Sequence, residues 1–290
     1  MSAAPSVGSV IPKLGIGLPY FSALPPELYR SGLVDFVEVT PETICRKRPV
    51  GNTATLEIVA AQLERARNTC AGLPLVVHGL ELSIGLADGW NDDYLQMLDA
   101  LQSKWPFVWH SEHLGFQPNQ PEGASPAVDR IAGRVLEIQD RYGVPFLLEN
   151  PAYCLPDAQA DPEVGDDIRL MRTITRNSGC FQLLDLHNIY CNAIHNEVDP
   201  LAAIDGMPLN AVAEIHVAGG SCNDGLWMDP HDGRVPEAVW ELLEYALPRC
   251  PLAGGVVFEI LASHAGRMGM DAIHQELLRA RKIWDRCKRG

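Results

Sequence analysis

The sequence predicts an α/β protein that folds as one (β/α)8 barrel, the TIM-barrel architecture. Short apolar segments alternate with amphipathic ones along the chain, and eight of them are predicted strands spaced about 20 to 40 residues apart. Six of the eight end in His, Asp, Glu or Asn, as barrel strands do where their carboxyl ends enter a polar site. The length of 290 residues suits one such domain. A doubly wound open sheet is the structural alternative, but no GxGxxG turn follows the first strand to support it.

The predicted strands are apolar runs bounded by turn residues. In chain order they cover residues 14–18, 35–39, 73–77, 107–109, 145–148, 181–184, 213–217 and 255–260. The run 181–184 shows the pattern best, because apolar residues give way at once to Asp185, His187 and Asn188. Such an abrupt change is typical of a buried parallel strand whose tip reaches a polar site.

The predicted helices place apolar residues three and four positions apart. After a short helix that follows residues 19–25, they cover residues 53–69, 91–104, 127–142, 165–176, 236–247 and 270–288. Asn91 is the expected N-cap of its helix, Gly143 the expected stop of the next, and Pro236 suits a first turn. Residues 1–12 are expected to be a flexible tail, and residues 13–290 the catalytic barrel domain.

Composition limits the classes of partner. The net charge of -14, from 37 acidic and 23 basic residues, disfavours nucleic acid as a partner, because phosphate recognition needs clustered cations. No apolar run approaches the roughly 18 residues that a membrane span requires, and the N-terminus lacks the pattern of a secretory signal. The eight cysteines form no CxxC pair and are expected to be reduced thiols. We therefore expect a cytoplasmic protein that contacts neither nucleic acid nor membrane.

The polar strand ends predict a metal centre. Strand ends of a parallel barrel converge on one face, so ligands far apart in sequence can form one set. Histidine with carboxylate suits first-row transition metals, and six ligands exceed the three of a catalytic zinc, which points to more than one ion. A single histidine is as readily a hydrogen-bonded core residue, whereas a buried unpaired carboxylate is costly. The six candidates are His78, His113, Glu149, Asp185, His216 and Glu259.

Other residues near these strand ends are secondary candidates. Asp229 and His231 lie two apart in a loop bounded by Gly233, so both can turn toward one ion, although Asp, Pro and Gly are also turn residues. Asn188, like Asn150, is expected either to coordinate through its amide oxygen or to hold a carboxylate. His110 could line the pocket, and Glu112 could orient an imidazole. We assign predicted catalytic roles to Asp185, Glu112 and His187.

Taken in order, these motifs resemble those of a known family. They are HG at His78, SEHL at His113, LLENP at Glu149, LLDLHNIYCNA at Asp185, EIHVAG at His216, a D-x-H-G-like loop at His231 and a late FE at Glu259. The chain is similar here to the multinuclear non-heme iron-dependent oxidative enzymes, which include the iron oxygenase of methanobactin biosynthesis and the cysteine-modifying enzyme of 3-thiaglutamate biosynthesis. The strand-two motif differs, since of the relatives' Ser-Glu-Asn only Glu42 is kept.

The resemblance implies a barrel that holds two or three iron ions and uses O2 to modify a cysteine of a ribosomally made precursor peptide. Carbon excision is expected ahead of oxazolone or thioamide heterocycle formation. It also implies a small partner protein that grips the leader peptide, as a heterodimer with this chain. Carried over by position, the metal ligands are His78, His113, Glu149, Asp185 or Asn188, His216, Asp229, His231 and Glu259.

Two other functions stay open at this point. A xylose-isomerase-like barrel with Mn, Mg or Zn would isomerise a sugar or hydrolyse a phosphodiester, but it would need a Lys or Arg near a strand end, and none is evident. A non-enzymatic metal store or peptide carrier would bind metal with no turnover to lose.

Overall fold

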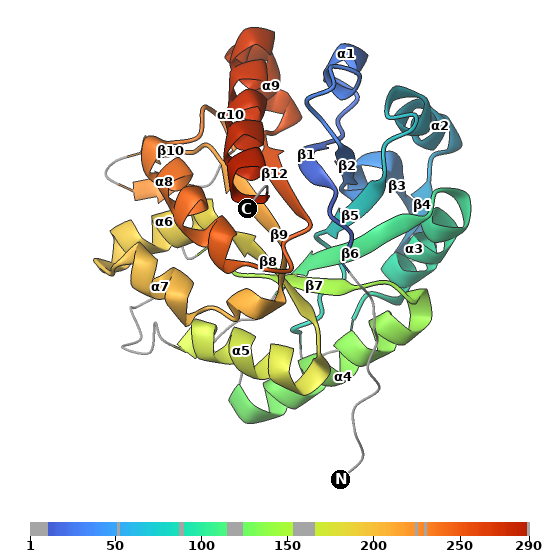
Figure 1. Ribbon diagram of the computed structural model, residues 1–290. Coiled ribbons are helices and arrows are strands. Elements are labelled where there is room, and N and C mark those ends of the chain that lie inside the picture. The colour runs from blue at the N-terminus through green and yellow to red at the C-terminus, as the bar shows by residue number, and fades with distance from the viewer. Residues whose placement is uncertain are drawn as a thin grey trace.

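The computed structural model describes residues 11–50, 53–86, 90–114, 124–152, 166–223, 226–228 and 231–288 (Figure 1). Of the predicted tail, residues 1–10 lie outside this range. Ile11 is already buried and packs on the core inside the barrel, so the packed chain includes residues that were predicted to be flexible.

Eight parallel strands close into a barrel in the order β1-β12-β9-β8-β7-β6-β5-β2. The predicted (β/α)8 fold is therefore confirmed, and each predicted strand corresponds to one barrel strand. The strands are β1 Gly15–Pro19, β2 Phe36–Val39, β5 Leu75–Gly79, β6 Phe107–His113, β7 Phe146–Glu149, β8 Phe181–Asp185, β9 Val212–Ala218 and β12 Gly255–Glu259.

Helices surround the barrel, as Figure 1 shows. They are α1 Pro26–Tyr29, α2 Ala60–Thr69, α3 Asp92–Lys104, α4 Ala124–Tyr142, α5 Asp166–Ser178, α6 Leu186–Asn196, α7 Pro200–Gly206, α8 Glu237–Ala246, α9 Ala262–Met268 and α10 Met270–Lys288, with short 3-10 turns η1 Pro41–Ile44, η2 Leu209–Ala211 and η3 Leu247–Arg249. Asn91 caps α3 as predicted, since its side chain accepts a hydrogen bond from Tyr94 N. Pro236 is the N-cap of α8, one residue before the predicted position.

The predicted helix at 53–69 is wrong in its first part. Residues Thr53–Ile58 form strand β4, which pairs antiparallel with β3, Cys45–Val50, and only Ala60–Thr69 is helical. The segment TATLEI alternates polar and apolar residues and is rich in β-branched ones, which favours a strand. A second hairpin, β10 Ser221–Asn223 with β11 Leu226–Met228, was also not predicted.

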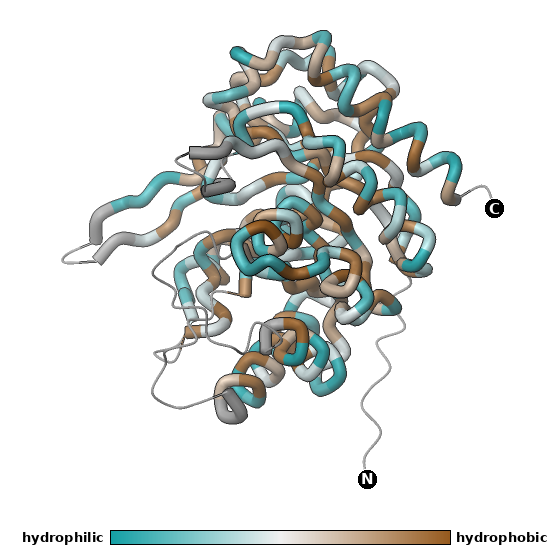
Figure 2. The backbone as a smooth tube through the Cα atoms, turned by 90° about the vertical axis from the view of Figure 1, so that its left-hand side faces the viewer, coloured by the Kyte–Doolittle hydropathy of each residue, from teal (hydrophilic) through white to brown (hydrophobic). Residues whose placement is uncertain are grey.

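The C-terminal helix α10 is amphipathic. Figure 2 shows apolar and polar residues alternating along the helix that leads to the C-terminus. Its buried side chains include Ile273, Leu277 and Ile283, whereas Lys282 and Arg286 are exposed. In the described part of the chain, no helix is both long and apolar enough to cross a membrane.

Strand alternation divides the barrel interior into two layers. The lower layer is apolar and consists of Ile11, Phe36, Val76, Trp109, Leu147, Leu183, Ala213 and Val257. Gly17 and Gly255 leave room for it, since a Cβ atom at either would come within 2.6 Å of the Phe36 ring. Side chains two residues further along a strand point to the same face. The upper layer, toward the carboxyl ends, therefore contains Glu38, His78, Ser111, Glu149, Asp185 and Glu259.

Candidate metal centre

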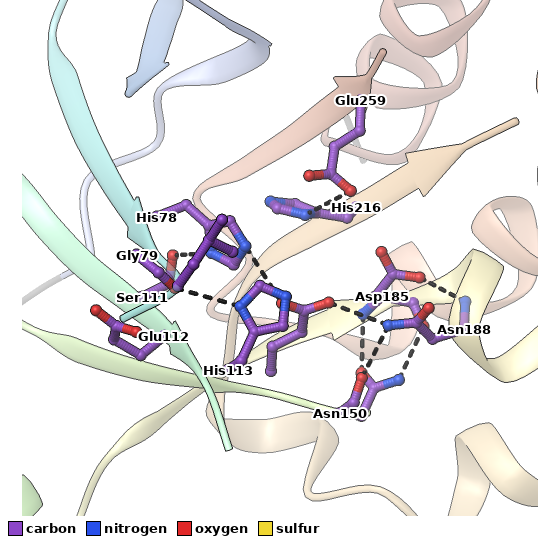
Figure 3. A network of polar contacts seen from close by, with 12 residues as sticks. His78, Gly79, Ser111, Glu112, His113, Asn150, Asp185, Asn188, His216 and Glu259 are labelled. Carbon is purple, nitrogen blue, oxygen red and sulfur yellow. Dashed lines mark hydrogen bonds and ion pairs between the residues drawn. The ribbon is translucent and has the colours of Figure 1, made fainter. Parts of the chain in front are cut away.

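Three neighbouring strands bring the first group of metal-competent side chains together. His78 lies near the end of β5, and His113 and Glu149 are the last residues of β6 and β7. Glu149 Oε2 lies 3.3 Å from His78 Nε2 and 3.2 Å from His113 Nε2. The three ligand atoms are within 4.8 Å of one another, a spacing that one ion can span (Figure 3).

Hydrogen bonds fix which nitrogen of each imidazole is available. His113 Nδ1 lies 3.2 Å from Gly79 O, which can only accept, so Nδ1 carries the proton. Ser111 Oγ donates to Val77 O and therefore accepts from His78 Nδ1 at 3.0 Å. In the neutral form of each ring, Nε2 is therefore the nitrogen without a proton, and it faces Glu149, as in metal-binding histidines whose other nitrogen is held by a polar partner.

Asn188 orients the carboxylate of this group. Its Nδ2 donates to Glu149 Oε1 at 3.1 Å and to Asn150 O at 3.1 Å. Asn150 in turn exchanges hydrogen bonds with the backbone of Asp185, at 2.8 Å and 3.0 Å. Asn188 Oδ1 is buried and has no hydrogen-bond partner among the described residues, which leaves an amide oxygen for a ligand at this point.

A second group shares His78 with the first. It combines His78, His216 and Glu259, with ligand atoms again within 4.8 Å of one another. Glu259 Oε2 lies 3.1 Å from His216 Nδ1 and 3.6 Å from His231 Nε2. His231 adopts a positive φ of 48°, an uncommon conformation for a residue other than glycine and one that occurs often at functional sites. The two groups are adjacent, so a centre with more than one ion fits the geometry.

The electrostatics of the two groups differ. Burial lowers the pKa of His78 well below its ordinary value, and the neighbouring His113 and His216 act in the same direction. Burial also opposes the charge of His216, but Glu259 and Glu38 outweigh it and raise the His216 pKa. For Glu259, His216 and His231 outweigh burial and lower the pKa. His78 is therefore neutral and ready to bind metal, whereas His216 and Glu259 form an ion pair without metal.

The groups open onto a cavity of about 420 Å³. Its polar lining includes Glu38, His78, His113, Glu149 and Glu259. Its apolar lining includes Phe21, Leu80, Leu114, Ile260 and Leu261, of which the exposed Leu80 and Leu261 form the rim. The described lining contributes no lysine or arginine. An organic substrate can therefore reach the ligands through an apolar entrance.

Comparison with known proteins assigns the chain to a family. The sequence profile described as RiPP precursor modification enzyme MbnB/TglH/ChrH, where RiPP denotes a ribosomally synthesised and post-translationally modified peptide, matches residues 14–284. The chain belongs to this family. It is similar to a UPF0276 protein of Caulobacter vibrioides, at 32% identity over 270 residues and 89% of each chain. A UPF0276 protein of Acinetobacter baylyi is 30% identical over 226 residues, with 74% of this chain and 73% of that protein covered.

Solved structures of similar fold are distant in sequence. A xylose isomerase domain protein from Planctomyces limnophilus has a TM-score of 0.60 at 12% identity, with 97% of this chain and 100% of that chain covered. A xylose isomerase domain containing protein from Salmonella typhimurium has a TM-score of 0.58 at 13% identity, covering 94% and 98%. At these identities the likeness concerns the fold alone, and it confirms the TIM barrel.

In this RiPP-modification family member, most of the predicted ligands meet at one place. His78, His113, Glu149, His216, His231 and Glu259 all lie in or beside the two groups. Asp185 is buried at the end of β8, and its Oδ1 accepts a 2.6 Å hydrogen bond from Asn188 N as the N-cap of α6. Asp229 lies outside the described residues. The ligand roles of all nine predicted residues stay predictions.

His187 and His110 lie away from the two groups of ligands. The strand ends at Asp185, so His187 belongs to α6, where it is fully buried and lies 3.7 Å from Cys191 Sγ. His110 alternates with the inward-facing residues of β6 and packs against Phe107 and Phe146 outside the barrel. The catalytic role predicted for His187 stays a prediction.

Two buried carboxylates near the site were missed. Glu38 on β2 and Glu214 on β9 form a third group with His216, with ligand atoms within 4.8 Å of one another. Both lie inside apolar strands. Glu214 precedes His216 by two residues, so strand alternation places these two side chains on the same face, after an irregularity in the pairing of β8 with β9. A charged residue within an apolar strand was the available signal, but only strand ends were considered.

Glu112 is buried on the outer side of β6. Its Oε1 lies 3.1 Å from His110 Nε2, so the imidazole that it orients is not a candidate ligand. Burial raises the pKa of Glu112 to about 8, despite opposing effects of Tyr94 and His113. Its predicted catalytic role stays a prediction.

The raised pKa of Glu112 gives a stability prediction. A raised pKa means that the folded state prefers the protonated acid. The contribution of Glu112 to stability is therefore full below the ordinary pKa of 4.5 and is lost as pH rises toward about 8. Glu112→Gln mimics the protonated acid and cannot ionise. We expect the free energy of unfolding of Glu112→Gln to match that of wild type near about pH 5. Above about pH 8 the variant should be more stable than wild type, by up to a few kcal/mol. A difference in stability between the two proteins that stays constant across this pH range, measured by thermal unfolding, would contradict the prediction.

Proposed function

We propose that this protein is an iron- and O2-dependent enzyme that oxidatively modifies a cysteine residue of a ribosomally synthesised peptide. The observation that carries the proposal is the group His78, His113 and Glu149, whose imidazole nitrogens and carboxylate converge at a cavity of about 420 Å³ with an apolar rim. Membership of a RiPP precursor modification family supports a peptide as substrate.

The donor set fits iron. Imidazole nitrogens combined with carboxylates and an amide oxygen suit first-row transition metals, whereas Mg²⁺ prefers an all-oxygen set. The unpartnered Asn188 Oδ1 adds one oxygen donor beside Glu149. Iron held there would supply coordination positions for a thiolate and one-electron chemistry with O2.

The side chains of the chain would then have distinct tasks. Ser111 and Gly79 O hold the imidazoles of His78 and His113, and Asn188 holds Glu149. The His113 side chain is 43% exposed, so this group faces the cavity and is where a substrate thiol could approach. The rim residues Leu80 and Leu261 would cover the peptide on either side and limit water near the reacting sulfur. Asp185, Glu112 and His187 are proposed as further contributors to catalysis.

Turnover of a cysteine peptide tests the proposal. The protein is reconstituted anaerobically with Fe²⁺ and mixed with the Cys-containing peptide encoded beside its gene, and with the same peptide carrying Cys→Ser. We expect O2 consumption with the cysteine peptide and none above background with the serine peptide. Mass spectrometry then separates the two product classes, because excision removes one carbon and heterocycle formation removes hydrogen only. Iron-loaded protein that leaves the peptide unchanged and consumes no O2 would contradict the proposal.

Further observations and assays distinguish the alternative functions. A phosphodiesterase needs cations for phosphate, and the described cavity lining offers none, so the geometry does not favour it. Sugar isomerisation is tested with Mn²⁺-loaded protein and an aldose, where we expect no ketose product. Metal binding without any turnover would indicate a storage or carrier protein instead.

We also propose that a small leader-peptide-binding protein presents the peptide to this chain. The candidate surface is a hollow of about 450 Å³ between α8 and α10, lined by Glu244, Leu278, Arg279, Lys282 and Ile283 among others. Co-expression with the product of the neighbouring gene and size-exclusion chromatography tests this. Separate elution of the two proteins, with and without peptide, would contradict it.

A further inference from the structure

His216 differs from the other imidazoles of the centre in its supports. His78 and His113 hold one nitrogen against a neutral oxygen, from Ser111 and Gly79 respectively. Both ring nitrogens of His216 instead face carboxylates, with Glu259 Oε2 at 3.1 Å from Nδ1 and Glu38 Oε2 at 3.0 Å from Nε2. A second buried carboxylate in contact with one imidazole needs a physical reason, because burying a charge is costly.

On its Nε2 side, His216 belongs to a buried network of side chains from three barrel strands. Glu38 comes from β2, Glu214 and His216 from β9, and Trp109 from β6. Trp109 Nε1 donates to Glu214 Oε2 at 2.8 Å, and Glu214 Oε1 lies 3.9 Å from His216 Nε2. All four residues are at most 1% exposed. The network is therefore buried, with Glu38 also lining the cavity and Trp109 also belonging to the apolar lower layer.

The two sides of His216 differ in how their carboxylates are held. A neutral imidazole binds metal through one nitrogen and keeps its proton on the other. On the Nδ1 side, His78, Glu259 and His231 converge at the cavity. On the Nε2 side, one oxygen of Glu214 is already occupied by the Trp109 indole, and Glu38 lies at hydrogen-bond distance. The geometry thus favours metal at Nδ1 and a proton on Nε2.

We propose that Glu38 is a positioning residue that accepts the Nε2–H hydrogen bond of His216 and so directs Nδ1 to the metal. Glu214, held by Trp109, lies on the same side of the His216 ring, with its Oε1 3.9 Å from Nε2. The arrangement is a carboxylate–histidine–metal relay, in which the outer carboxylate fixes the ring orientation and strengthens the ligand. This inference rests on the metal centre of the proposed function, and it concerns binding of the ion rather than turnover.

Metal affinity tests the role of Glu38 without an activity assay. His113→Ala weakens the first group, so Co²⁺ titrated into this background reports on the position held by His216 and Glu259. In that background Glu38→Ala is expected to weaken Co²⁺ binding about 10- to 100-fold, the range typical of outer-shell partners. Glu38→Gln, whose amide oxygen still accepts the hydrogen bond, is expected to recover part of the loss. Gln182→Leu removes an equally buried polar group of the barrel wall and is expected to leave Co²⁺ affinity unchanged.

The tautomer gives a second readout that a merely structural role would not produce. In Zn²⁺-loaded protein, ¹⁵N-resolved NMR of histidine is expected to show His216 protonated at Nε2 and metal-bound at Nδ1. Metal at Nε2 would overturn the proposal, as would unchanged Co²⁺ affinity in folded Glu38→Ala. If Glu38→Ala does not fold, the near-isosteric Glu38→Gln decides by the same criterion, because a charged acceptor and a neutral one should differ in affinity. Wild-type protein that binds no metal would instead contradict the proposed function itself.

Discussion

Glu149→Ala is expected to lower metal affinity at the His78–His113 position by at least about 100-fold, which is the upper end of the effect of losing an outer partner. Glu149 Oε2 lies within 3.3 Å of both imidazole nitrogens, so its loss removes the anionic ligand of the first group. Turnover of the cysteine peptide should fall below detection as a consequence. Metal content by elemental analysis and O2 consumption measure the two effects.

Two further variants separate ligand loss from misfolding. Glu276→Ala removes a comparably buried carboxylate, on α10, whose partner is Arg234. It is expected to cost stability but to keep metal content. His113→Ala removes a half-exposed ligand and is expected to reproduce the metal loss of Glu149→Ala with little cost in stability. Full metal content in folded Glu149→Ala would mean that the first group is not a metal position.

His216→Ala is expected to destabilise the metal-free protein by about 3–5 kcal/mol near neutral pH, the usual cost of removing one partner of a buried ion pair. The change leaves Glu38, Glu214 and Glu259 buried together without the cation that lies between them. Urea unfolding in the presence of a chelator measures the loss. His274→Ala, on α10, is the matched control and is expected to change stability by less than about 1 kcal/mol.

The pH dependence of this loss has a defined sign. The His216 pKa is raised. The contribution of His216 to stability is therefore full below the ordinary pKa of 6.5 and is lost as pH rises through the raised value. The Glu259 pKa is lowered, so its contribution is present above the ordinary value of 4.5 and is lost as pH falls. The difference between wild type and His216→Ala should therefore be largest between those two values. A difference that grows steadily toward alkaline pH would contradict the ion pair.

Local chemistry was enough to predict which polar side chains gather at the strand ends. Glu149 follows three apolar residues, and a carboxylate in that setting needs a strong partner. Hairpin β3–β4 escaped prediction because Leu56, Val59 and Leu63 satisfy a helical spacing while the preceding TATLEI also alternates like a strand. Pairing with the basic strand β3, a contact between segments, decided between the two patterns.

By itself, the sequence determined the barrel class, the order of its strands and the face on which the polar residues gather, because strand period and strand-end composition are local properties. Only the tertiary structure decided how the ligands divide into groups, since His78 joins two of them through distances between strands that are far apart in the chain. It also decided that Glu112 faces outward and that Glu38 contacts His216. Those roles depend on strand register and barrel closure, which no single segment encodes.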